Sequence, residues 1–193
     1  MAYTKIEEIL TWLKENLDEK RYEHSIGTAE CAKELSKKYA IDEEKAYIAG
    51  LLHDCAKCFP KEKLISIIDE HLDVDLCERS NHKTLHAPVS AYIAQTVFHI
   101  TDEEILSSIR WHTLGKLKMS DFEKIIFLAD KIENRTRENW YANPIRKCLE
   151  ENNGLDKAMF QCYRQTIKSL VDRDLKICPI TVDIYNFYCE LLT

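Results

Sequence analysis

The chain has 193 residues, of which 45% are apolar, so its length fits one domain that can bury a sizeable core. This composition excludes intrinsic disorder, and the scarcity of glycine and proline, with four of each, favours long helices over a turn-rich sandwich or a Rossmann sheet. A net charge of −6 disfavours a general nucleic-acid partner. We therefore predict a single all-α domain over residues 1–193, built as a bundle of eight to ten helices.

The compartment is inferred from what the sequence does not contain. No run approaches the roughly 18 apolar residues of a membrane span, and the first residues lack the apolar segment of a secretory leader. We expect a cytoplasmic protein with no membrane partner, in which the eight cysteines are reduced thiols. Cys55 and Cys58 form a Cys-x-x-Cys pattern without a second pair, so we interpret them as core thiols rather than a redox or zinc site.

Hydrophobic spacing predicts four helices in the first part of the chain. They begin with a capping-box pattern at Thr4 and then cover residues 21–39, 42–58 and 61–71, followed by a polar, aperiodic segment at 72–85. The helix at 21–39 has an inward stripe that contains His24. The helix capped by Asp42 is strongly apolar, and Pro60 prevents its continuation.

The second part of the chain predicts further helices and no strand. We expect them at residues 88–99, 101–112, 120–130, from Pro144, at 155–173 and after Pro179. Pro88 suits a first helical turn and places His86 beside the cap of its helix. Ser120 and Glu123 form a capping box.

Six histidine and aspartate side chains lie on inward faces or near ends of the predicted helices. The dipeptide His53-Asp54 has no weight by itself, because chance alone produces such a pair often. Its position adds weight, since a carboxylate in a strongly apolar helix is costly to bury unless a cation or several donors satisfy it. Partners from other predicted helices are His24, His86, His112 and Asp130. Such nitrogen and oxygen ligands suit iron, manganese or zinc better than magnesium or calcium, and Asp54 is the natural bridge between two ions.

Five blocks of the sequence resemble the HD-domain metal-dependent phosphohydrolases and, within them, the bacterial YqeK-like branch. The blocks are Arg-Tyr-Glu-His at 21–24, Leu-His-Asp-Cys-Ala-Lys at 52–57, Leu-His-Ala-Pro-Val at 85–89, Ile-Arg-Trp-His-Thr-Leu-Gly at 109–115 and the segment Met119 to Glu133. The resemblance implies a motif-bearing core at about 20–135, on which helices from 140–193 pack. It also implies symmetrical hydrolysis of diadenosine tetraphosphate to two molecules of ADP.

The same resemblance implies two bound divalent ions, iron above manganese or zinc. One ion would be held by His24, His53, Asp54 and Asp130, and the other by Asp54, His86 and His112. Asp54, Lys57 and His112 would be catalytic. The residues expected to contact substrate are Arg21, His86, His112, Thr113, Asp130, Arg135, Arg173 and Lys176, the last two from a segment that reaches Cys178.

Several alternatives stay open at this point. The arginine that contacts phosphate is Arg135 or Arg137, because the sequence after Asp130 departs from the family pattern. The basic cluster of Arg135, Arg137, Arg146 and Lys147 is either a phosphate-facing rim or a solvated surface, and His82 is the alternative to His86 as a ligand. Another HD phosphohydrolase, acting on a nucleoside monophosphate or a cyclic nucleotide, would share the core ligands. A non-catalytic metal-dependent nucleotide sensor is the contrasting class. Base preference and oligomeric state, including a homodimer, are also open.

Overall fold

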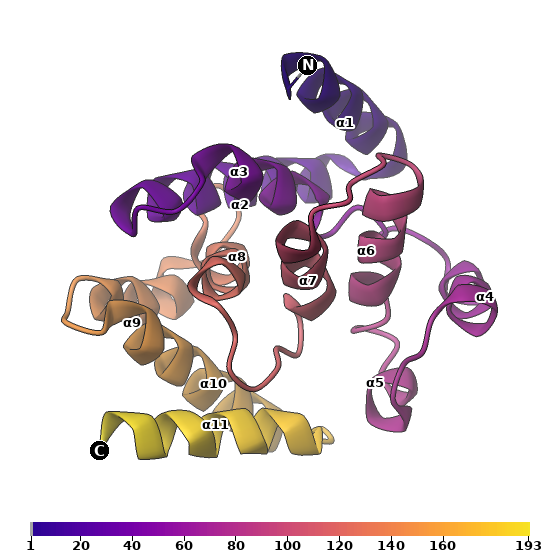
Figure 1. The fold of residues 1–193 in the computed structure, drawn as a ribbon. Helices are drawn as coiled ribbons and strands as arrows, with labels where there is room; N and C mark the ends of the chain where they lie inside the picture. The colour runs from indigo at the N-terminus through magenta and orange to yellow at the C-terminus, as the bar shows by residue number, and fades with distance from the viewer. Residues whose placement is uncertain (1) are drawn as a thin grey trace.

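The computed structural model describes residues 2–193, and over this range the chain forms eleven helices and no strand (Figure 1). The helices are α1 (Ala2–Asn16), α2 (Glu19–Lys38), α3 (Glu43–Leu52), α4 (Lys61–His71), α5 (Leu76–Ser80), α6 (His86–Thr96), α7 (Glu103–Trp111), α8 (Asp121–Ile132), α9 (Asn139–Leu149), α10 (Gly154–Asp172) and α11 (Pro179–Leu192). The all-α prediction is confirmed. The number of helices exceeds the eight to ten expected, and the short helix α5 lies in a segment predicted to be aperiodic.

Side chains that cap the first turn define where several helices begin. Asp18, Asp42, Asp75 and Asp102 each accept backbone N–H groups at the start of α2, α3, α5 and α7. Ser120 and Glu123 form the expected capping box of α8. The prediction at Thr4 is wrong in position, because α1 already begins at Ala2.

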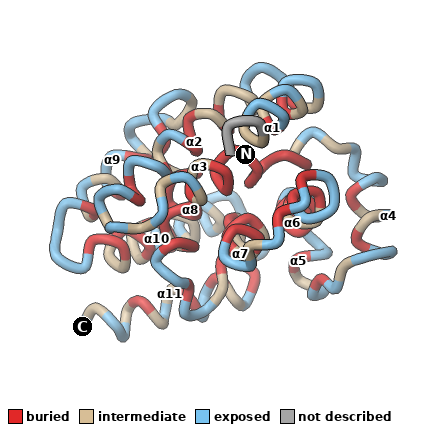
Figure 2. The backbone as a smooth tube through the Cα atoms, turned by 45° about the horizontal axis from the view of Figure 1, so that its top comes forward, coloured by how far each residue is buried: buried red, intermediate tan, exposed pale blue. Residues whose placement is uncertain are grey.

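The central helices are α2, α3, α7 and α8. Helix α2 packs along α3 and α8, while α7 contacts α3, α6 and α8. On one side α4 packs against α6, and on the other α9 and α10 pack against α8, with α11 on α10 (Figure 1). Figure 2 shows buried backbone through α3 and α8, which contribute most of their residues to the core. Among the described helices, none combines the length and the apolarity that crossing a bilayer requires.

Helix α3 ends six residues before the predicted end at Cys58. After Leu52 the hydrogen bonds shorten to a three-residue spacing, with Cys55 N donating to Leu52 O at 3.2 Å and Lys57 N to Asp54 O at 2.9 Å. The apolar run continues through this tighter turn because Cys55 and Ala56 are fully buried. The change of geometry places His53 and Asp54 just beyond a helix end rather than inside a helix.

Pro144 does not open a helix, as the sequence predicted, but lies inside α9, which begins at Asn139. Proline in a helix interior removes one backbone hydrogen bond and costs about 3 kcal/mol. The helix keeps its course because Ala142, Ile145 and Leu149 bury one of its faces, and such packing outweighs local propensity.

Two of the eight cysteines are not free thiols. Cys77 in α5 forms a disulfide with Cys178, the residue that precedes α11. The prediction of eight reduced thiols is therefore wrong at these two positions. Spacing gave no sign of the pair, because 101 residues separate its members and only the packing of the chain brings them together.

Candidate metal centre

The six predicted ligands meet at one buried place, and most of them lie at helix ends. His24 is inside α2, whereas His53 and Asp54 follow the last residue of α3. The other three are His86 at the start of α6, His112 directly after α7 and Asp130 near the end of α8. All six are at most 4% exposed.

Asp54 lies between two groups of imidazoles. Its Oδ1 is 2.8 Å from His86 Nε2 and 3.2 Å from His112 Nε2. Its Oδ2 faces the other way, 3.9 Å from His53 Nε2 and 4.0 Å from His24 Nε2. One carboxylate thus presents each of its oxygens to a different pair of histidines, as a bridging ligand does.

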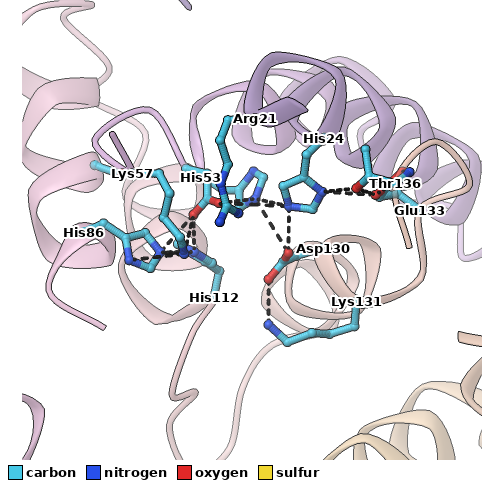
Figure 3. A network of polar contacts seen from close by, with 12 residues as sticks. Arg21, His24, His53, Lys57, His86, His112, Asp130, Lys131, Glu133 and Thr136 are labelled. Carbon is cyan, nitrogen blue, oxygen red and sulfur yellow. Dashed lines mark hydrogen bonds and ion pairs between the residues drawn. The ribbon is translucent and has the colours of Figure 1, made fainter. Parts of the chain in front are cut away.

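The group around His24 contains a second carboxylate. Asp130 Oδ1 is 2.9 Å from His24 Nε2 and 3.8 Å from His53 Nε2, and the two imidazole Nε2 atoms are 3.3 Å apart (Figure 3). His24, His53 and Asp130 can offer three ligand atoms that all lie within 4.8 Å of one another. His53, Asp54 and His112 meet the same condition.

Hydrogen bonds fix the orientation of three imidazole rings. The Nδ1 groups of His53 and His112 each donate to a peptide carbonyl at 2.7 Å, of Gly50 and Ile109 respectively. These carbonyls belong to the last turns of α3 and α7, where the helix leaves carbonyl groups without a partner. His24 donates from Nδ1 to Glu133 Oε1 at 3.1 Å.

A neutral imidazole that donates from Nδ1 presents an unprotonated Nε2. The Nε2 atoms of His24 and His53 would then face each other as two lone pairs at 3.3 Å, a contact that favours a cation next to both atoms. His86 and His112 show a similar contact at 3.1 Å. This donor set fits divalent transition metals, for which neutral imidazole and carboxylate are ordinary ligands.

Burial keeps two of the imidazoles neutral. It lowers the pKa of His53 to about 3 and that of His86 to about 4. Burial also acts to lower the pKa of His24, but hydrogen bonds to Asp130 and Glu133 raise it overall. His24 therefore lies where the surrounding carboxylates most strongly attract a positive charge, which a proton or a metal ion can supply.

The two ligand carboxylates stay ionised in spite of their burial. Burial acts to raise the pKa of Asp130, but Lys131 and Arg137 hold it well below its usual value. Lys131 Nζ is 2.6 Å from Asp130 Oδ2. The pKa of Asp54 also lies well below its usual value, because interactions with the imidazoles, first His86, outweigh the effect of burial.

A cavity of about 730 Å³ opens above the cluster and is strongly basic. Asp54 and Asp130 form part of its lining, and the basic residues around them are Arg21, Lys57, Lys61, Lys83, Lys131, Arg137 and Arg173. A chain with a net charge of −6 therefore concentrates positive charge at one hollow. This field suits a ligand with several negative charges.

Lys57 and Arg21 reach the cluster from this cavity. Lys57 Nζ lies 2.9 Å from His86 Nε2 and 3.5 Å from Asp54 Oδ1, and burial lowers its pKa. Arg21 Nη1 is 3.8 Å from Asp54 Oδ2. Both side chains therefore lie between the cavity and the cluster.

Arg137, rather than Arg135, faces the cavity. Arg137 contacts the carboxylate of Asp130 and lies 3.1 Å from His24 Nε2. Arg135 points outward and pairs with Glu23 and Glu30 on α2 at 2.5 and 2.7 Å. The expectation that Arg135 contacts substrate is therefore not supported by its position. The reason is that acidic residues on α2 compete for its side chain.

The remaining substrate-contact candidates line cavities that adjoin each other. Thr113 lines the large cavity, and its buried Oγ1 has no hydrogen-bond partner in the described structure. Arg173 lines both the large cavity and a neighbouring one of about 380 Å³. Lys176 lines that neighbour and a third space of about 200 Å³, but not the large cavity.

His82, the alternative to His86 as a ligand, is exposed and lies at the wall between the cavities of about 730 and 380 Å³.

Glu133 and Lys131 are not among the residues predicted from the sequence, although both stand in a block that carried the resemblance. Glu133 is fully buried, and its pKa falls to about 2 because hydrogen bonds, first from His24, outweigh burial. A signal was present: Glu133 follows Asp130 by three residues, which keeps both acids on one side of the helix end.

The Cys-x-x-Cys pattern does not form a site of its own. Cys55 is fully buried, and its Sγ lies 3.7 Å from the carbonyl oxygen of Ser90, whereas Cys58 is exposed. The interpretation as core thiols is correct for Cys55 and wrong for Cys58. The tight turn after α3 places the Cys55 side chain in the core and the Cys58 side chain at the surface.

Comparisons with known proteins find similarity over most of the chain. A family model described as "HD domain" matches residues 21–135. A Staphylococcus aureus protein named "Bis(5'-nucleosyl)-tetraphosphatase, symmetrical" is 36% identical over 185 residues, covering 95% of this chain and 94% of that protein. A Bacillus subtilis protein of the same name is 37% identical, covering 94% and 96%.

The fold also matches a solved structure. A crystal structure from Clostridium acetobutylicum, described as a predicted HD superfamily hydrolase involved in NAD metabolism, superposes with a TM-score of 0.89 at 38% identity. The similarity covers 96% of this chain and 97% of that one. The family match spans the segment that carries all six buried histidine and aspartate residues, and this chain therefore belongs to the HD domain family.

Proposed function

We propose that this protein is a metal-dependent symmetrical bis(5′-nucleosyl)-tetraphosphatase, which hydrolyses diadenosine tetraphosphate to two molecules of ADP. The observation that carries the proposal is Asp54, whose two oxygens face two separate groups of imidazoles at the floor of a basic cavity. The S. aureus and B. subtilis relatives, similar over nearly their whole length, bear the name of this activity.

The six buried residues would hold two divalent ions. His24, His53 and Asp130 with Asp54 Oδ2 form one group, and His86 and His112 with Asp54 Oδ1 form the other. Such ions would polarise a phosphate oxygen and lower the pKa of a bound water, so that hydroxide is available near neutral pH. We propose iron, with manganese or zinc as alternatives, because these metals accept the same ligands.

The basic side chains of the cavity would hold the polyphosphate. Lys57 and Arg21 lie beside Asp54, while Arg137 and Lys131 lie beside Asp130, so positive groups surround the cluster on both sides. Positive charges placed before the reaction stabilise the charge that develops on the phosphate oxygens in the transition state. The cavity is therefore suited to a chain of several phosphates rather than to one phosphate group.

The nucleoside of one ADP half would occupy the neighbouring cavity of about 380 Å³. Its lining combines the apolar Leu170 and Leu175 with the polar Asn81, and it shares Arg173 with the phosphate cavity. Apolar walls with a few polar groups are typical of sites for small organic ligands. Thr113, whose Oγ1 lacks a partner, could donate a hydrogen bond to a phosphate oxygen.

The decisive experiment is a product assay on purified protein loaded with iron under reducing conditions. Diadenosine tetraphosphate should give ADP as the single nucleotide product, as resolved by chromatography. AMP with ATP would contradict symmetrical cleavage. Hydrolysis of nucleoside monophosphates or cyclic nucleotides instead would assign the protein to another HD phosphohydrolase. Binding without turnover would indicate a sensor.

The metal is tested separately. Elemental analysis of protein purified without oxygen should find two transition-metal ions per chain, with iron predominant. A single ion per chain would contradict the bridging role of Asp54, whatever the product assay shows.

A further inference from the structure

Glu133 is a buried carboxylate that belongs to neither group of proposed metal ligands. It is the C-cap residue of α8 and is 0% exposed. Its Oε1 accepts a hydrogen bond from His24 Nδ1 at 3.1 Å and another from the hydroxyl of Thr136 (Figure 3). The backbone N–H groups of Arg135 and Thr136 donate to its Oε2 at 2.5 and 3.0 Å. Glu133 therefore joins the imidazole of His24 to the chain segment that follows α8.

The space for this carboxylate is provided by a glycine on α2. A Cβ atom at Gly27 would collide with Glu133 Oε2, and it would also lie 3.2 Å from Arg135 Cβ. Gly27 follows His24 by three residues, so it lies on the same side of α2. Helix α2 thus contributes the imidazole and, one turn later, the room for its carboxylate partner.

His24 requires such a partner because of its place in the fold. His53 and His112 follow helix ends and donate to free carbonyl groups of their own last turns. His24 lies in the interior of α2, where the preceding carbonyl groups are already used in helical hydrogen bonds. The acceptor for its Nδ1 must therefore be a side chain from another element, and Glu133 of α8 supplies it.

We propose that Glu133 is a positioning residue, which holds the Nδ1–H form of His24 and directs its Nε2 toward Asp54 and Asp130. The same carboxylate orders residues 135 and 136, directly before Arg137, which contacts Asp130. Glu133 thereby sets the geometry of the His24 side of the cluster through two routes. The inference rests on the metal-binding role proposed for His24, and it adds a residue that touches neither ion nor substrate.

The test compares Glu133→Gln with Glu123→Gln, a second buried glutamate of the same helix that lies at its other end. Titration of Mn²⁺ or Zn²⁺ against a chelator should show one of the two ions bound roughly 10- to 100-fold more weakly in Glu133→Gln, the range seen when partners of metal ligands are removed. The other ion should be unaffected. Glu123→Gln should bind both ions as the wild type does.

The second readout does not depend on metal or activity. Nitrogen-15 NMR of the histidine rings in metal-free wild-type protein, recorded above the raised pKa of His24 so that its ring is neutral, should show the proton on Nδ1, and this preference should be lost in Glu133→Gln. Gly27→Ala keeps Glu133 in the sequence but fills the space that its carboxylate occupies. It should therefore also abolish the Nδ1 preference of His24. The proposal is overturned if both variants keep the wild-type ring form and ion affinity.

The experiment also separates this inference from the proposed function. If wild-type protein lacks the tetraphosphatase activity but the NMR change is seen, the function fails and the positioning role stands. If Glu133→Gln does not fold, Thr136→Val removes a hydroxyl that contacts Glu133 Oε1 and also lies 3.3 Å from His24 Nδ1, and it should give the same changes at smaller size. Wild-type ring form and affinity in a folded Thr136→Val, together with an unchanged Gly27→Ala, would overturn the proposal.

Discussion

The two halves of the buried cluster differ in how their imidazoles are supported. In the half formed by His24, His53 and Asp130, both rings donate from Nδ1 to a fixed acceptor, and Asp54 and Asp130 both lie within reach. In the half formed by His86 and His112, Asp54 is the carboxylate in contact, and His86 Nδ1 has the ammonium of Lys57 at 3.4 Å as its neighbour. More negative charge and firmer rings predict tighter ion binding in the His24 half.

Removing the residue that the two halves share should have the largest effect. Asp54→Ala should lower turnover by roughly three orders of magnitude, the upper range for loss of a preorganised charged group. Metal content should fall to one ion or none, as measured by elemental analysis. Asp121→Ala, which removes an exposed aspartate on α8, serves as the control. Two retained ions in an active Asp54→Ala protein would remove the bridging assignment.

His86→Ala tests whether the halves are independent. We expect one ion per chain to remain, held by the His24 half, and turnover to fall roughly 100-fold, as when one element of electrostatic stabilisation is lost. His82→Ala, which changes a histidine at the cavity wall, should keep both ions. If His86→Ala kept both ions while His82→Ala lost one, His82 would be the ligand.

The two neighbouring arginines give a matched pair for the cavity. Arg137→Gln should raise KM roughly 10- to 100-fold, because a hydrogen bond to a charged group contributes about 1.5–3 kcal/mol. Arg135→Gln should leave KM within about twofold, since its guanidinium pairs with Glu23 and Glu30 away from the cavity. The reverse order of effects would show that the loop after α8 rearranges when substrate binds.

Acidity should weaken the metal-free protein through both halves. The pKa values of His53 and His86 fall from 6.5 to about 3 and about 4 in the folded state. Between pH 6.5 and these values, the two imidazoles bind protons in the unfolded chain but stay neutral in the folded protein. The free energy of unfolding therefore decreases as pH falls, by about 1 kcal/mol for each ring from pH 6.5 to 5.5. His24 has a raised pKa, so the folded imidazole already holds the proton that the unfolded one is still taking up between pH 6.5 and 5.5, and this ring offsets part of the loss.

Denaturant unfolding of metal-free protein at a series of pH values measures this effect. His86→Ala should reduce the slope between pH 6.5 and 5.5 by about half. An unchanged slope would mean that another group is responsible.

Helix starts could be predicted from the sequence where a side chain enforces them. Asp42, Asp102 and Ser120 cap α3, α7 and α8 as expected, because a capping hydrogen bond is a local event. Errors arose where tertiary packing overrides local preference. Helix α9 contains Pro144 because burial of one face of this helix outweighs the cost of the proline. The apolar run after Leu52 continues as a tight turn and not as a helix.

The residues of the candidate site could be named from the sequence, but their relations could not. His24 and Asp130 stand 106 positions apart, and only the packing of α2 on α8 shows that they are 2.9 Å from each other. A second contact between distant residues lies next to the site. Gly115 adopts a positive φ of 75° beside Tyr163, whose hydroxyl donates to Leu114 O. The spacing of residues in the sequence does not predict contacts between residues this far apart in the chain.

The disulfide between Cys77 and Cys178 divides the chain topologically. It closes residues 77–178 into a covalent ring that contains His86, His112 and Asp130, while His24, His53 and Asp54 belong to the linear N-terminal arm. In the chain-entropy model, closing a loop of this size restricts the unfolded ensemble by about 4.7 kcal/mol. After denaturation, a protein cut by a protease inside the ring would keep its two fragments linked until a reductant is added, whereas a cut in the arm would give two separate fragments.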